Sequence, residues 1–526
     1  MKDGAMQPYR LTLDKFLDHA ARWHADTEVV TARIGGAIAR IGYAGLRERA
    51  LRVSGALAGF GVGTGCRVAT LAWNSQAHVE AWFGIMGMGA TCHTLNPRLN
   101  ADQTATMLRL SGAQVAIVSA DLLPLGREIA GKASLRHILV IDGDATGAGN
   151  GATVQPLEPL LSEATADAAW GDFDENTACG LCFTSGTTGQ PKGVTYTHRS
   201  SYLHTLRLLQ ADVMGMTAQD TVMPVVPMFH ANAWGMPFAA PAVGAKLVLP
   251  GRQLDGASLA RLIVAEGVTI ASAVPTVWLG LVEHLEAEGG DVPSLKRVVV
   301  GGSAMPPALM ERIERRLGVA VQTSWGMTEL SPLGTIAPPD LVCRDAALSG
   351  RPALGIDLLL TDAGGNALPQ QRDAEGHLRV RGPSVVERYL GQDEPATDVD
   401  GWFDTGDLAR IDGKGNLVIT GRAKDLIKSG GEWINPAQIE AVVGALPQVS
   451  LAAVVGRADA RWGERPILLV EMRKNEDLAD EELLASLDGQ VAPWWIPEEV
   501  VRLEKMPVAP TGKVDKLRLR SQYGQI

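Results

Sequence analysis

Apolar residues recur along the first 360 or so positions with two alternating periods, one typical of helices and one typical of buried strands. Residues 43–61 (YAGLRERALRVSGALAGFG) carry apolar side chains at helical spacing, and residues 66–73 (CRVATLAW) form a short apolar run. Residues 77–91 repeat this order of helix and strand. Further short apolar runs, several ending in small or acidic residues as parallel strands often do, occupy residues 113–120, 137–144, 221–227, 245–251, 268–275 and 295–302. This alternation predicts an α/β protein with mostly parallel, buried sheets.

The pattern changes near residue 362. Residues 361–382 and 400–422 carry turn residues every few positions, which predicts short antiparallel strands in a small β-barrel-like region. A helix is then expected at residues 435–446, with an asparagine cap and a proline in its first turn, and another at residues 480–491. We therefore predict a large N-terminal α/β domain, residues 1–421, and a small α+β domain, residues 422–526, which the resemblance described below implies is mobile.

Composition and charge narrow the function classes. The net charge of the 526 residues is -11, so a nucleic-acid binder with a basic face is not expected. The start of the chain has no apolar core of signal-peptide length. The apolar stretch 223–249 is interrupted by prolines, His230 and Lys246. We therefore expect neither a signal peptide nor a membrane span.

The cysteines do not form a recognisable disulfide or zinc pattern. Five cysteines in so long a chain are too few for a disulfide scaffold, which favours a reducing, cytoplasmic location. Cys179 and Cys182 form a CxxC, but no second pair or nearby histidine completes a zinc site. We interpret their apolar surroundings as a buried strand.

Residues 179–198 (CGLCFTSGTTGQPKGVTYTH) carry the most informative pattern. A strand runs into a segment rich in glycine and hydroxyl residues that ends in one lysine. Glycines let the backbone approach polyphosphate, and successive N–H groups form an anion-binding nest. The segment does not fit GxxxxGK[ST], so a Walker-type NTPase is not expected, and a polar surface turn is the alternative. The candidate phosphate contacts are Thr184, Ser185, Gly186, Thr187, Thr188, Gly189 and Lys192.

Two acidic residues follow in later segments. Glu329, in TSWGMTELSP, comes after an apolar strand and a tight turn, where a carboxylate could hold Mg²⁺ near phosphates or cap a helix. Asp407, in GWFDTGDLARI, is expected between two short strands. A carboxylate there could accept both hydroxyls of a ribose, although a turn-forming aspartate is the simpler interpretation.

These three segments, followed by GRAKDLIKSGGEWI and PTGKVDK, resemble the adenylate-forming superfamily in content and order. That superfamily contains acyl-CoA synthetases, peptide-synthetase adenylation domains and beetle luciferases. The resemblance covers nearly the whole chain, and VPMFHANAWGMPF and IKSGGEWI are most similar to medium-chain fatty acyl-CoA ligases and methylthiopropionate-CoA ligases. It implies an enzyme that uses ATP and Mg²⁺ to activate a carboxylic acid as an acyl-adenylate and then passes the acyl group to coenzyme A.

The resemblance also implies roles for residues of the large domain. The loop 184–192 would clamp the β- and γ-phosphates, and Thr184 with Glu329 would hold Mg²⁺. Asp407 and Arg422 would hold the ribose. The segments that would frame the adenine and the α-phosphate contain Gly302, Ser303, Ala304, Trp325, Gly326, Met327 and Thr328, with Trp325 standing where many relatives carry tyrosine.

In the small domain, Lys513 in TGKVDK matches the catalytic lysine of the adenylation step, although the residues alone favour a mobile charged tail. Lys424 matches the hinge about which the small domain of relatives rotates before coenzyme A attacks. That rotation would bring a pantetheine channel to the active site, and two glycines suit a strand that approaches a ligand closely, with a plain hairpin turn as the alternative. The residues concerned are Lys428, Gly430, Gly431 and Glu432.

The acid itself is less clearly encoded. His230 occurs where amino-acid-activating relatives carry an aspartate, so an amino-acid substrate is not expected, and a core histidine is the alternative. We count His230 as a catalytic and a substrate-binding candidate, and Gly302 as a further substrate contact. Bulky tryptophans favour a short- or medium-chain fatty acid or a methylthiopropionate-like acid. Apolar side chains that suit either an acyl pocket or plain core are Met228, Trp234, Met236, Phe238, Trp278 and Met305.

Other activities fit the same motifs. An aryl-CoA ligase of the coumarate or benzoate type would keep all of them, as would an adenylation enzyme that loads a separate carrier protein, whereas a luciferase-like oxygenase is remote. A nucleotide-binding regulator without turnover is disfavoured by the intact Lys513, Glu329 and Asp407. The expected partners are a small carboxylic acid, ATP and coenzyme A, without nucleic acid, and the sequence is compatible with a homodimer.

Overall fold

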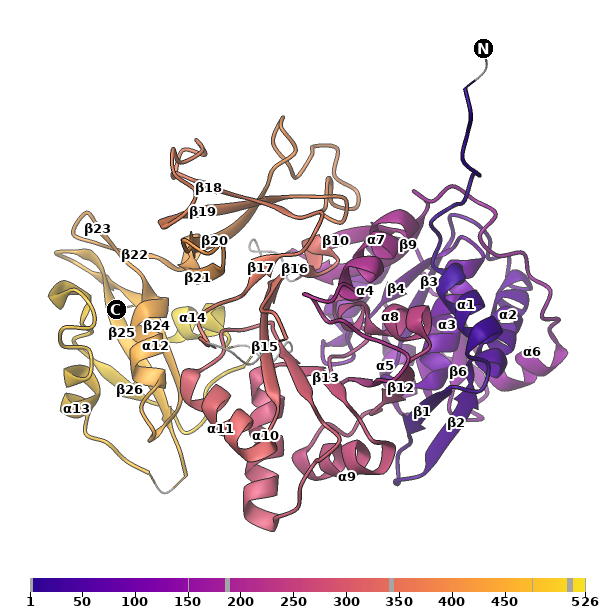
Figure 1. Cartoon of the computed structure of the whole chain (residues 1–526), viewed down its shortest axis with the longest axis horizontal. Helices are drawn as coiled ribbons and strands as arrows, with labels where there is room; N and C mark the ends of the chain where they lie inside the picture. The colour runs from indigo at the N-terminus through magenta and orange to yellow at the C-terminus, as the bar shows by residue number, and fades with distance from the viewer. Residues whose placement is uncertain are drawn as a thin grey trace.

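The computed structural model describes residues 3–149, 151–184, 190–339, 345–474, 476–508 and 514–525. Within these ranges, two large and mostly parallel sheets form the centre and right of the molecule (Figure 1). The nine-stranded sheet has the order β17-β16-β15-β14-β13-β11-β12-β1-β2: Arg351–Pro352, Leu333–Ile336, Ala320–Gly326, Arg297–Val300, Ile270–Ala273, Thr221–Pro224, Lys246–Leu249, Glu28–Ala32 and Ile38–Gly42. The eight-stranded sheet has the order β10-β9-β4-β3-β5-β6-β8-β7: Lys192–Thr197, Ala178–Thr184, Thr91–Thr94, Arg67–Leu71, Val115–Ser119, His137–Ile141, Ala152–Pro156 and Gly147–Gly149.

Helices cover these sheets and lie between them. α3 is buried along nearly its whole length, because it contacts β4 and β9 of one sheet and β1 of the other. Its mainly apolar sequence fits such a position between two layers. The α-helices of this part are α1 (Asp14–Trp23), α2 (Tyr43–Ala58), α3 (Gln76–Gly87), α4 (Ala101–Ser111), α5 (Leu123–Ala130), α6 (Leu157–Glu163), α7 (His198–Leu208), α8 (Met236–Val243), α9 (Gly256–Glu266), α10 (Pro275–Glu288) and α11 (Pro307–Leu317).

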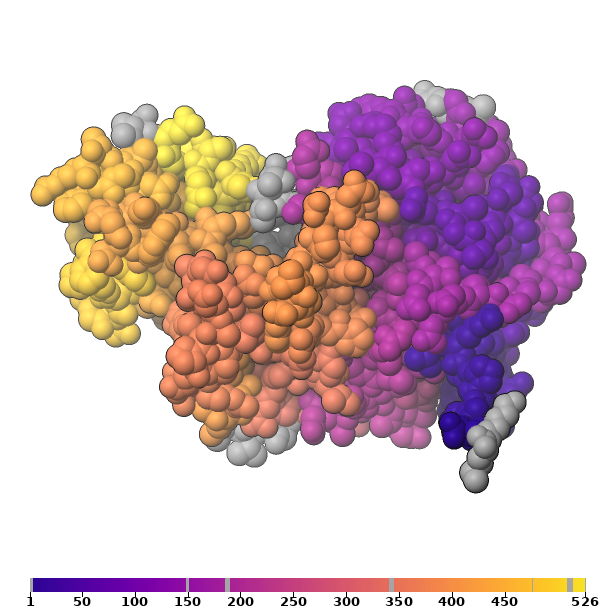
Figure 2. All heavy atoms as spheres, turned by 90° about the horizontal axis from the view of Figure 1, so that it is seen from above, coloured from indigo at the N-terminus to yellow at the C-terminus, as the bar shows by residue number. Residues whose placement is uncertain are grey.

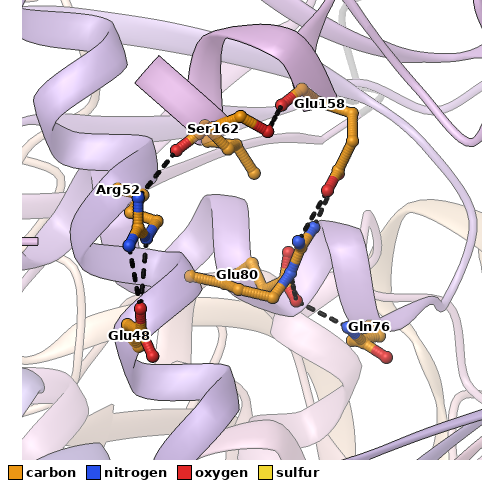
Figure 3. Close-up of polar contacts among 8 residues, drawn as sticks. Glu48, Arg52, Gln76, Glu80, Glu158 and Ser162 are labelled. Atoms are coloured by element: carbon orange, nitrogen blue, oxygen red, sulfur yellow. Dashed lines mark hydrogen bonds and ion pairs between the residues drawn. The ribbon is translucent and has the colours of Figure 1, made fainter. Parts of the chain in front are cut away.

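A hydrogen-bonded group of one arginine and two carboxylates joins three of these helices, as Figure 3 shows. Glu80 of α3 accepts hydrogen bonds from Gln76 and from Arg49 of α2, at 2.7 and 2.8 Å. The two terminal nitrogens of Arg49 bind Glu158 of α6. Burial raises the pKa of Glu80, and Arg49 opposes that shift. The ion pair therefore fixes the helical layer, since an uncompensated buried charge would be costly.

The chain then forms a four-stranded antiparallel sheet, in orange in Figure 1. Its strands are β18 (Asp357–Thr361), β19 (Ala374–Arg381), β20 (Phe403–Ile411) and β21 (Leu417–Arg422). It is the region that the sequence predicts as β-barrel-like.

The C-terminal residues form a lobe at one end of the molecule, in light orange and yellow in Figure 2. Two hydrophobic clusters consist of residues from Ile427 onward. Asn435 caps α12 by accepting from the backbone of Ala437, as the sequence predicts. The elements are β22 (Ile427–Ser429), β23 (Glu432–Ile434), α12 (Pro436–Gly444), β24 (Val449–Asp459), β25 (Gly463–Met472), α13 (Asp480–Ala485), β26 (Val500–Arg502) and α14 (Lys516–Tyr523).

These observations confirm the predicted α/β class with a large N-terminal and a smaller C-terminal part. The CxxC cysteines lie in β9 and are buried and free, which confirms that this apolar run is a buried strand. The helix expected at 480–491 is shorter than predicted, because α13 ends at Ala485. No helix of the described residues is long and apolar enough to cross a membrane.

Candidate active site

The glycine-rich segment connects two antiparallel strands. β9 ends at Thr184 and β10 begins at Lys192, and the two residues face each other in the strand register. The intervening candidates Ser185, Gly186, Thr187, Thr188 and Gly189 lie outside the described residues. The hairpin therefore fixes the base of the predicted phosphate loop, with a hydroxyl on one strand and an ammonium group on the other.

Glu329 lies in the short 3₁₀ helix η3 (Thr328–Leu330), directly after β15. Its side chain is buried, and its Oε1 accepts a hydrogen bond of 3.0 Å from the hydroxyl of Tyr389. Its backbone carbonyl accepts from the N–H of Val386 at 2.7 Å. The backbone carbonyl of Thr328 is held by Tyr196 of β10 at 2.8 Å. Glu329 is therefore held in place through both its side chain and its backbone.

Tyr389 also lies against the phosphate hairpin. The Nζ of Lys192 is 4.9 Å from the centre of its ring, and the N–H of Leu390 donates to the carbonyl of Gly193 at 2.8 Å. The sequence reasoning missed Tyr389, because it is 60 positions from Glu329 and belongs to no motif that we singled out. The structure thus brings both Lys192 and Glu329 against one aromatic side chain, Lys192 at its ring and Glu329 at its hydroxyl.

These groups fit a magnesium site of the kind found with nucleotides. β9, which carries Thr184, contacts η3, which carries Glu329. A hydroxyl and one carboxylate are the hard oxygen donors that Mg²⁺ takes from proteins, with substrate phosphates and water completing the set. The described residues contain no cluster of three or more His, Cys, Asp or Glu that could hold a metal by itself. Such a site would thus depend on the nucleotide for part of its ligands.

The predicted ribose-binding residues form one hydrogen-bonded group. The Asp407 carboxylate accepts from the indole N–H of Trp325 at 2.9 Å and pairs with Arg422 Nε at 2.7 Å. The expectation that Asp407 lies between two strands is wrong: it lies within β20, opposite Arg422 of β21. The register of an antiparallel strand pair therefore brings the carboxylate to Arg422, and no turn is involved.

The segment predicted to frame the adenine follows β14, beside the strand that carries Trp325. The Ser324 hydroxyl donates to the carbonyl of Val300 at 2.9 Å. A Cβ on Gly301 would lie 2.6 Å from that hydroxyl oxygen and 3.1 Å from the ring of Trp234, so glycine permits this close approach. Gly302 is partly buried, Ser303 and Ala304 are exposed, and Met305 is buried. Trp325 is buried, whereas Gly326, Met327 and Thr328 are partly exposed.

The segment around His230 has an unusual backbone. His230 is extended, and the four residues that follow it all have left-handed φ angles of +43° to +55°, ending in Gly235 at +78°. A left-handed conformation costs about 1–2 kcal/mol for each residue other than glycine, so the surroundings must stabilise this turn. It places the buried Trp234 beside the adenine segment. Strain of this size is common at binding sites.

A buried asparagine holds the segment that leads to His230. The Asn74 amide donates to the carbonyls of Pro224 and Val226, each at 2.9 Å, and accepts from the N–H of Met228 at 2.7 Å. Asn74 follows β3 of the eight-stranded sheet, whereas its partners lie at the end of β11 of the nine-stranded sheet and just after it. It therefore ties the two sheets together at the predicted acyl segment. A single asparagine in LAWNS carries no sequence signal for this role.

The C-terminal candidates lie apart from these groups in the chain. Lys424 is exposed in η4 (Ala423–Asp425), and Lys428, also exposed, lies on β22. We expected Gly430 and Gly431 to lie within a strand. They instead form the left-handed turn between β22 and β23, with φ of +60° and +95°. Glu432 begins β23 and is exposed. Lys513 lies outside the described residues.

Comparison with known proteins identifies the family. A family model described as "AMP-binding enzyme" matches residues 16–390, and one described as "AMP-binding enzyme C-terminal domain" matches residues 438–513. The predicted boundary at 421/422 falls between the two matches and stays a prediction. A "Medium-chain-fatty-acid--CoA ligase" of Ectopseudomonas oleovorans is 41% identical over 99% of this chain and 98% of its own length. A "3-methylmercaptopropionyl-CoA ligase" of Ruegeria pomeroyi is 41% identical over 99% of both chains.

Solved structures agree with these matches. A fatty acyl CoA synthetase of Mycobacterium tuberculosis is 27% identical, covers 98% of both chains and has a TM-score of 0.76. An anthranilate CoA ligase has a TM-score of 0.88 over 98% of both chains at 24% identity, which shows the shared fold alone. The predicted family, fold and enzyme class are thereby confirmed. The chain belongs to the AMP-binding enzyme family.

Proposed function

We propose that this chain is an ATP-dependent acyl-CoA ligase, which joins a carboxylic acid to coenzyme A and releases AMP and pyrophosphate. The relatives named above are CoA ligases, and they match nearly the whole chain. The observation that supports the chemistry best is the meeting of Lys192 and Glu329 at Tyr389, beside the phosphate hairpin. A cation and a metal-binding carboxylate at one place suit the polyphosphate of ATP.

The first step needs positive charge. A carboxylate oxygen of the acid attacks the α-phosphorus, the bond to the β-phosphate oxygen breaks, and pyrophosphate leaves with the electron pair. Two unit charges 4 Å apart repel by about 4 kcal/mol at an effective dielectric near 20, so cations must offset the approach of acid and phosphate. Lys192, and Lys513 from the C-terminal part, would supply two of them.

Thr184 and Glu329 would hold Mg²⁺, whose charge neutralises phosphate oxygens when it is bound. Asp407 and Arg422 would orient the ribose, and the indole N–H of Trp325 donates a hydrogen bond to the Asp407 carboxylate. The adenine would lie along Gly302, Ser303 and Ala304, and the backbone at Gly326, Met327 and Thr328 would lie near the α-phosphate. These residues bind and orient ATP, and no protein nucleophile takes part.

The second step needs a different surface at the same centre. The thiol sulfur of coenzyme A attacks the acyl carbon, the acyl–phosphate oxygen bond breaks, and AMP leaves while the thiol proton passes to solvent. We propose that the C-terminal part turns about Lys424 and brings the hairpin of Lys428, Gly430, Gly431 and Glu432 to the acyl-adenylate. The exposed position of this hairpin leaves it available for such a contact.

We propose a short- or medium-chain fatty acid, or a methylthiopropionate-like acid, as the substrate. His230 stands where amino-acid-activating relatives carry an aspartate. The position therefore offers no carboxylate to a substrate ammonium group, which argues against amino acids. Trp234 at the left-handed turn, with Met305 and the His230 side chain, would line the acyl pocket beside Gly302. The named substrates of the two relatives that are 41% identical are consistent with this choice.

A panel of carboxylic acids tests the proposal directly, with AMP and pyrophosphate measured in the presence and absence of coenzyme A. We expect release of AMP that depends on the acid and is fastest with aliphatic acids. An enzyme that splits ATP with none of the acids would refute the proposal. Lys513→Ala should block acyl-adenylate formation from ATP and spare thioester formation from supplied acyl-adenylate, whereas equal loss in both half-reactions would contradict the role given to Lys513.

We further propose a cytoplasmic location, because the four cysteines that the structure describes are all free thiols. Export of the intact chain into an oxidising compartment would contradict it. A homodimer remains a prediction, and sedimentation at several protein concentrations tests it.

A further inference from the structure

Residues 386–390 cross between two parts of the proposed ATP site. At one end the N–H of Val386 binds the carbonyl of Glu329 at 2.7 Å. At the other end the N–H of Leu390 binds the carbonyl of Gly193, next to Lys192, at 2.8 Å. This short segment, which we call the 386–390 strap, therefore connects the acidic segment to the phosphate hairpin through its backbone.

One side chain of the strap repeats both connections. The hydroxyl of Tyr389 donates to Oε1 of Glu329 at 3.0 Å, and the ring lies 4.9 Å from the Nζ of Lys192. Tyr389 and Glu329 are both buried, at 9% and 7% exposure, so water competes little for the hydrogen bond. A cation over an aromatic face is attracted by the electron density of the ring, which orients the Lys192 ammonium group.

The hydroxyl is a reliable donor. A carboxylate oxygen accepts hydrogen bonds, so the phenol group supplies the proton of this contact. The bond occupies Oε1 of Glu329. Among the described residues, Tyr389 alone hydrogen-bonds this carboxylate, which leaves Oε2 for an external ligand.

We infer that Tyr389 is a positioning residue for ATP binding, which holds the Glu329 carboxylate and the Lys192 ammonium group in a fixed relation to each other. The inference rests on the proposed function in its use of Mg²⁺-ATP, although it does not depend on which acid is activated. Without Tyr389, binding of the metal and the phosphates would first have to order both side chains, and that ordering would weaken the affinity.

Three variants of the full-length chain separate this role from a general effect on folding. Tyr389→Phe removes the hydroxyl and keeps the ring, whereas Tyr389→Leu removes both. Tyr43→Phe is the matched control, because Tyr43 is also buried and its hydroxyl donates to the carbonyl of Ala245 at 2.6 Å, in a part of the chain without a proposed role in catalysis. The measurement is calorimetric binding of ATP at a series of Mg²⁺ concentrations, without acid or coenzyme A.

We expect Tyr389→Phe to weaken Mg²⁺-dependent ATP binding by about tenfold or more, the usual effect of losing a hydrogen bond to a charged group. Tyr389→Leu should weaken it further, because Lys192 loses its support, while Tyr43→Phe should bind as the wild type does. In a Glu329→Ala background, Tyr389→Phe should weaken binding no further, since the acceptor of its hydrogen bond is gone.

The inference is overturned if Tyr389→Phe binds Mg²⁺-ATP within about twofold of the wild type, or if its effect is equally large in the Glu329→Ala background. It is also overturned if Tyr43→Phe weakens ATP binding as much as Tyr389→Phe does, because the weakening would then reflect a general loss of stability. The proposed function fails in a different way: wild-type protein that binds Mg²⁺-ATP, loses that binding in Tyr389→Phe, and still activates no acid would uphold the positioning role and refute the ligase.

Discussion

Asn74 offers a direct test of how the two large sheets are joined at the acyl segment. Its side chain satisfies three backbone groups, namely the carbonyls of Pro224 and Val226 and the N–H of Met228. Asn74 is 3% exposed, so Asn74→Ala leaves these groups with little access to water. Each buried polar group left without a partner costs about 1–3 kcal/mol, and water entering the vacated space recovers part of that. We expect a loss of about 4 kcal/mol in the free energy of unfolding.

The expected shift in melting temperature follows from the size of the cooperative unit. Unfolding entropy is about 2.1 cal/mol/K per residue, so a unit of roughly 400 residues loses about 1 °C for each kcal/mol. Asn74→Ala should therefore lower the Tm by about 4 °C in differential scanning calorimetry, with a larger drop if a smaller unit unfolds. Asn366→Ala, in an exposed turn, is the control and should change the Tm by less than about 1 °C.

A second variant makes the test specific to hydrogen bonding. Asn74→Asp keeps the volume and the acceptor for Met228, but it places a carboxylate oxygen against two carbonyl oxygens. We expect it to be at least as destabilised as Asn74→Ala, and both variants should raise the KM for the acid more than the KM for ATP. A variant Asn74→Ala that melts within about 1 °C of the wild type, or an Asn74→Asp that is the more stable of the two, would refute the reasoning.

Three further predictions concern other parts of the molecule. Trp325→Phe removes the indole donor to Asp407 and should raise the KM for ATP about tenfold in a pyrophosphate-release assay, and an unchanged KM would show that the bond is dispensable. Gly430→Ala places a Cβ 2.7 Å from the Trp462 ring, so it should slow thioester formation and spare adenylation. An equal fall in acid-dependent pyrophosphate release without coenzyme A would contradict this. Burial lowers the pKa of four histidines, to about 4 for His78 and about 3 for His93, His198 and His204. In the unfolded state the same histidines take up protons below their ordinary pKa near 6.5, whereas in the folded state they stay neutral to lower pH. Stability should therefore fall as the pH falls from 6.5, by about 2 kcal/mol per histidine at pH 5, and a Tm that is flat from pH 7 to 5 would contradict this.

Sequence reasoning identified the site where chemistry is concentrated in short motifs. The strand before the phosphate loop, the acid after β15 and the cap of α12 each follow from neighbouring residues, so the chain encodes them locally. Tyr389 and Asn74 could not be found in this way, because each contacts partners 60 or more positions away and has an ordinary local setting. Asp407 was found, but its place in β20 depends on the register with β21. The left-handed turn after His230 is equally hidden, since only Gly235 and Asn232 are of types suited to that backbone, and Ala231, Ala233 and Trp234 are not.

That turn limits how the acid preference of this protein can be altered. Substituting β-branched residues or proline at positions 231–234 would oppose the left-handed backbone and would lose the fold before the pocket changed shape. Residues on regular elements, such as Trp278 of α10 or Met236 and Phe238 of α8, carry no such backbone strain, but all three are buried in the core, so only apolar substitutions of similar volume suit them. Libraries limited to apolar residues at such helical positions should yield folded protein more often than libraries that randomise the turn.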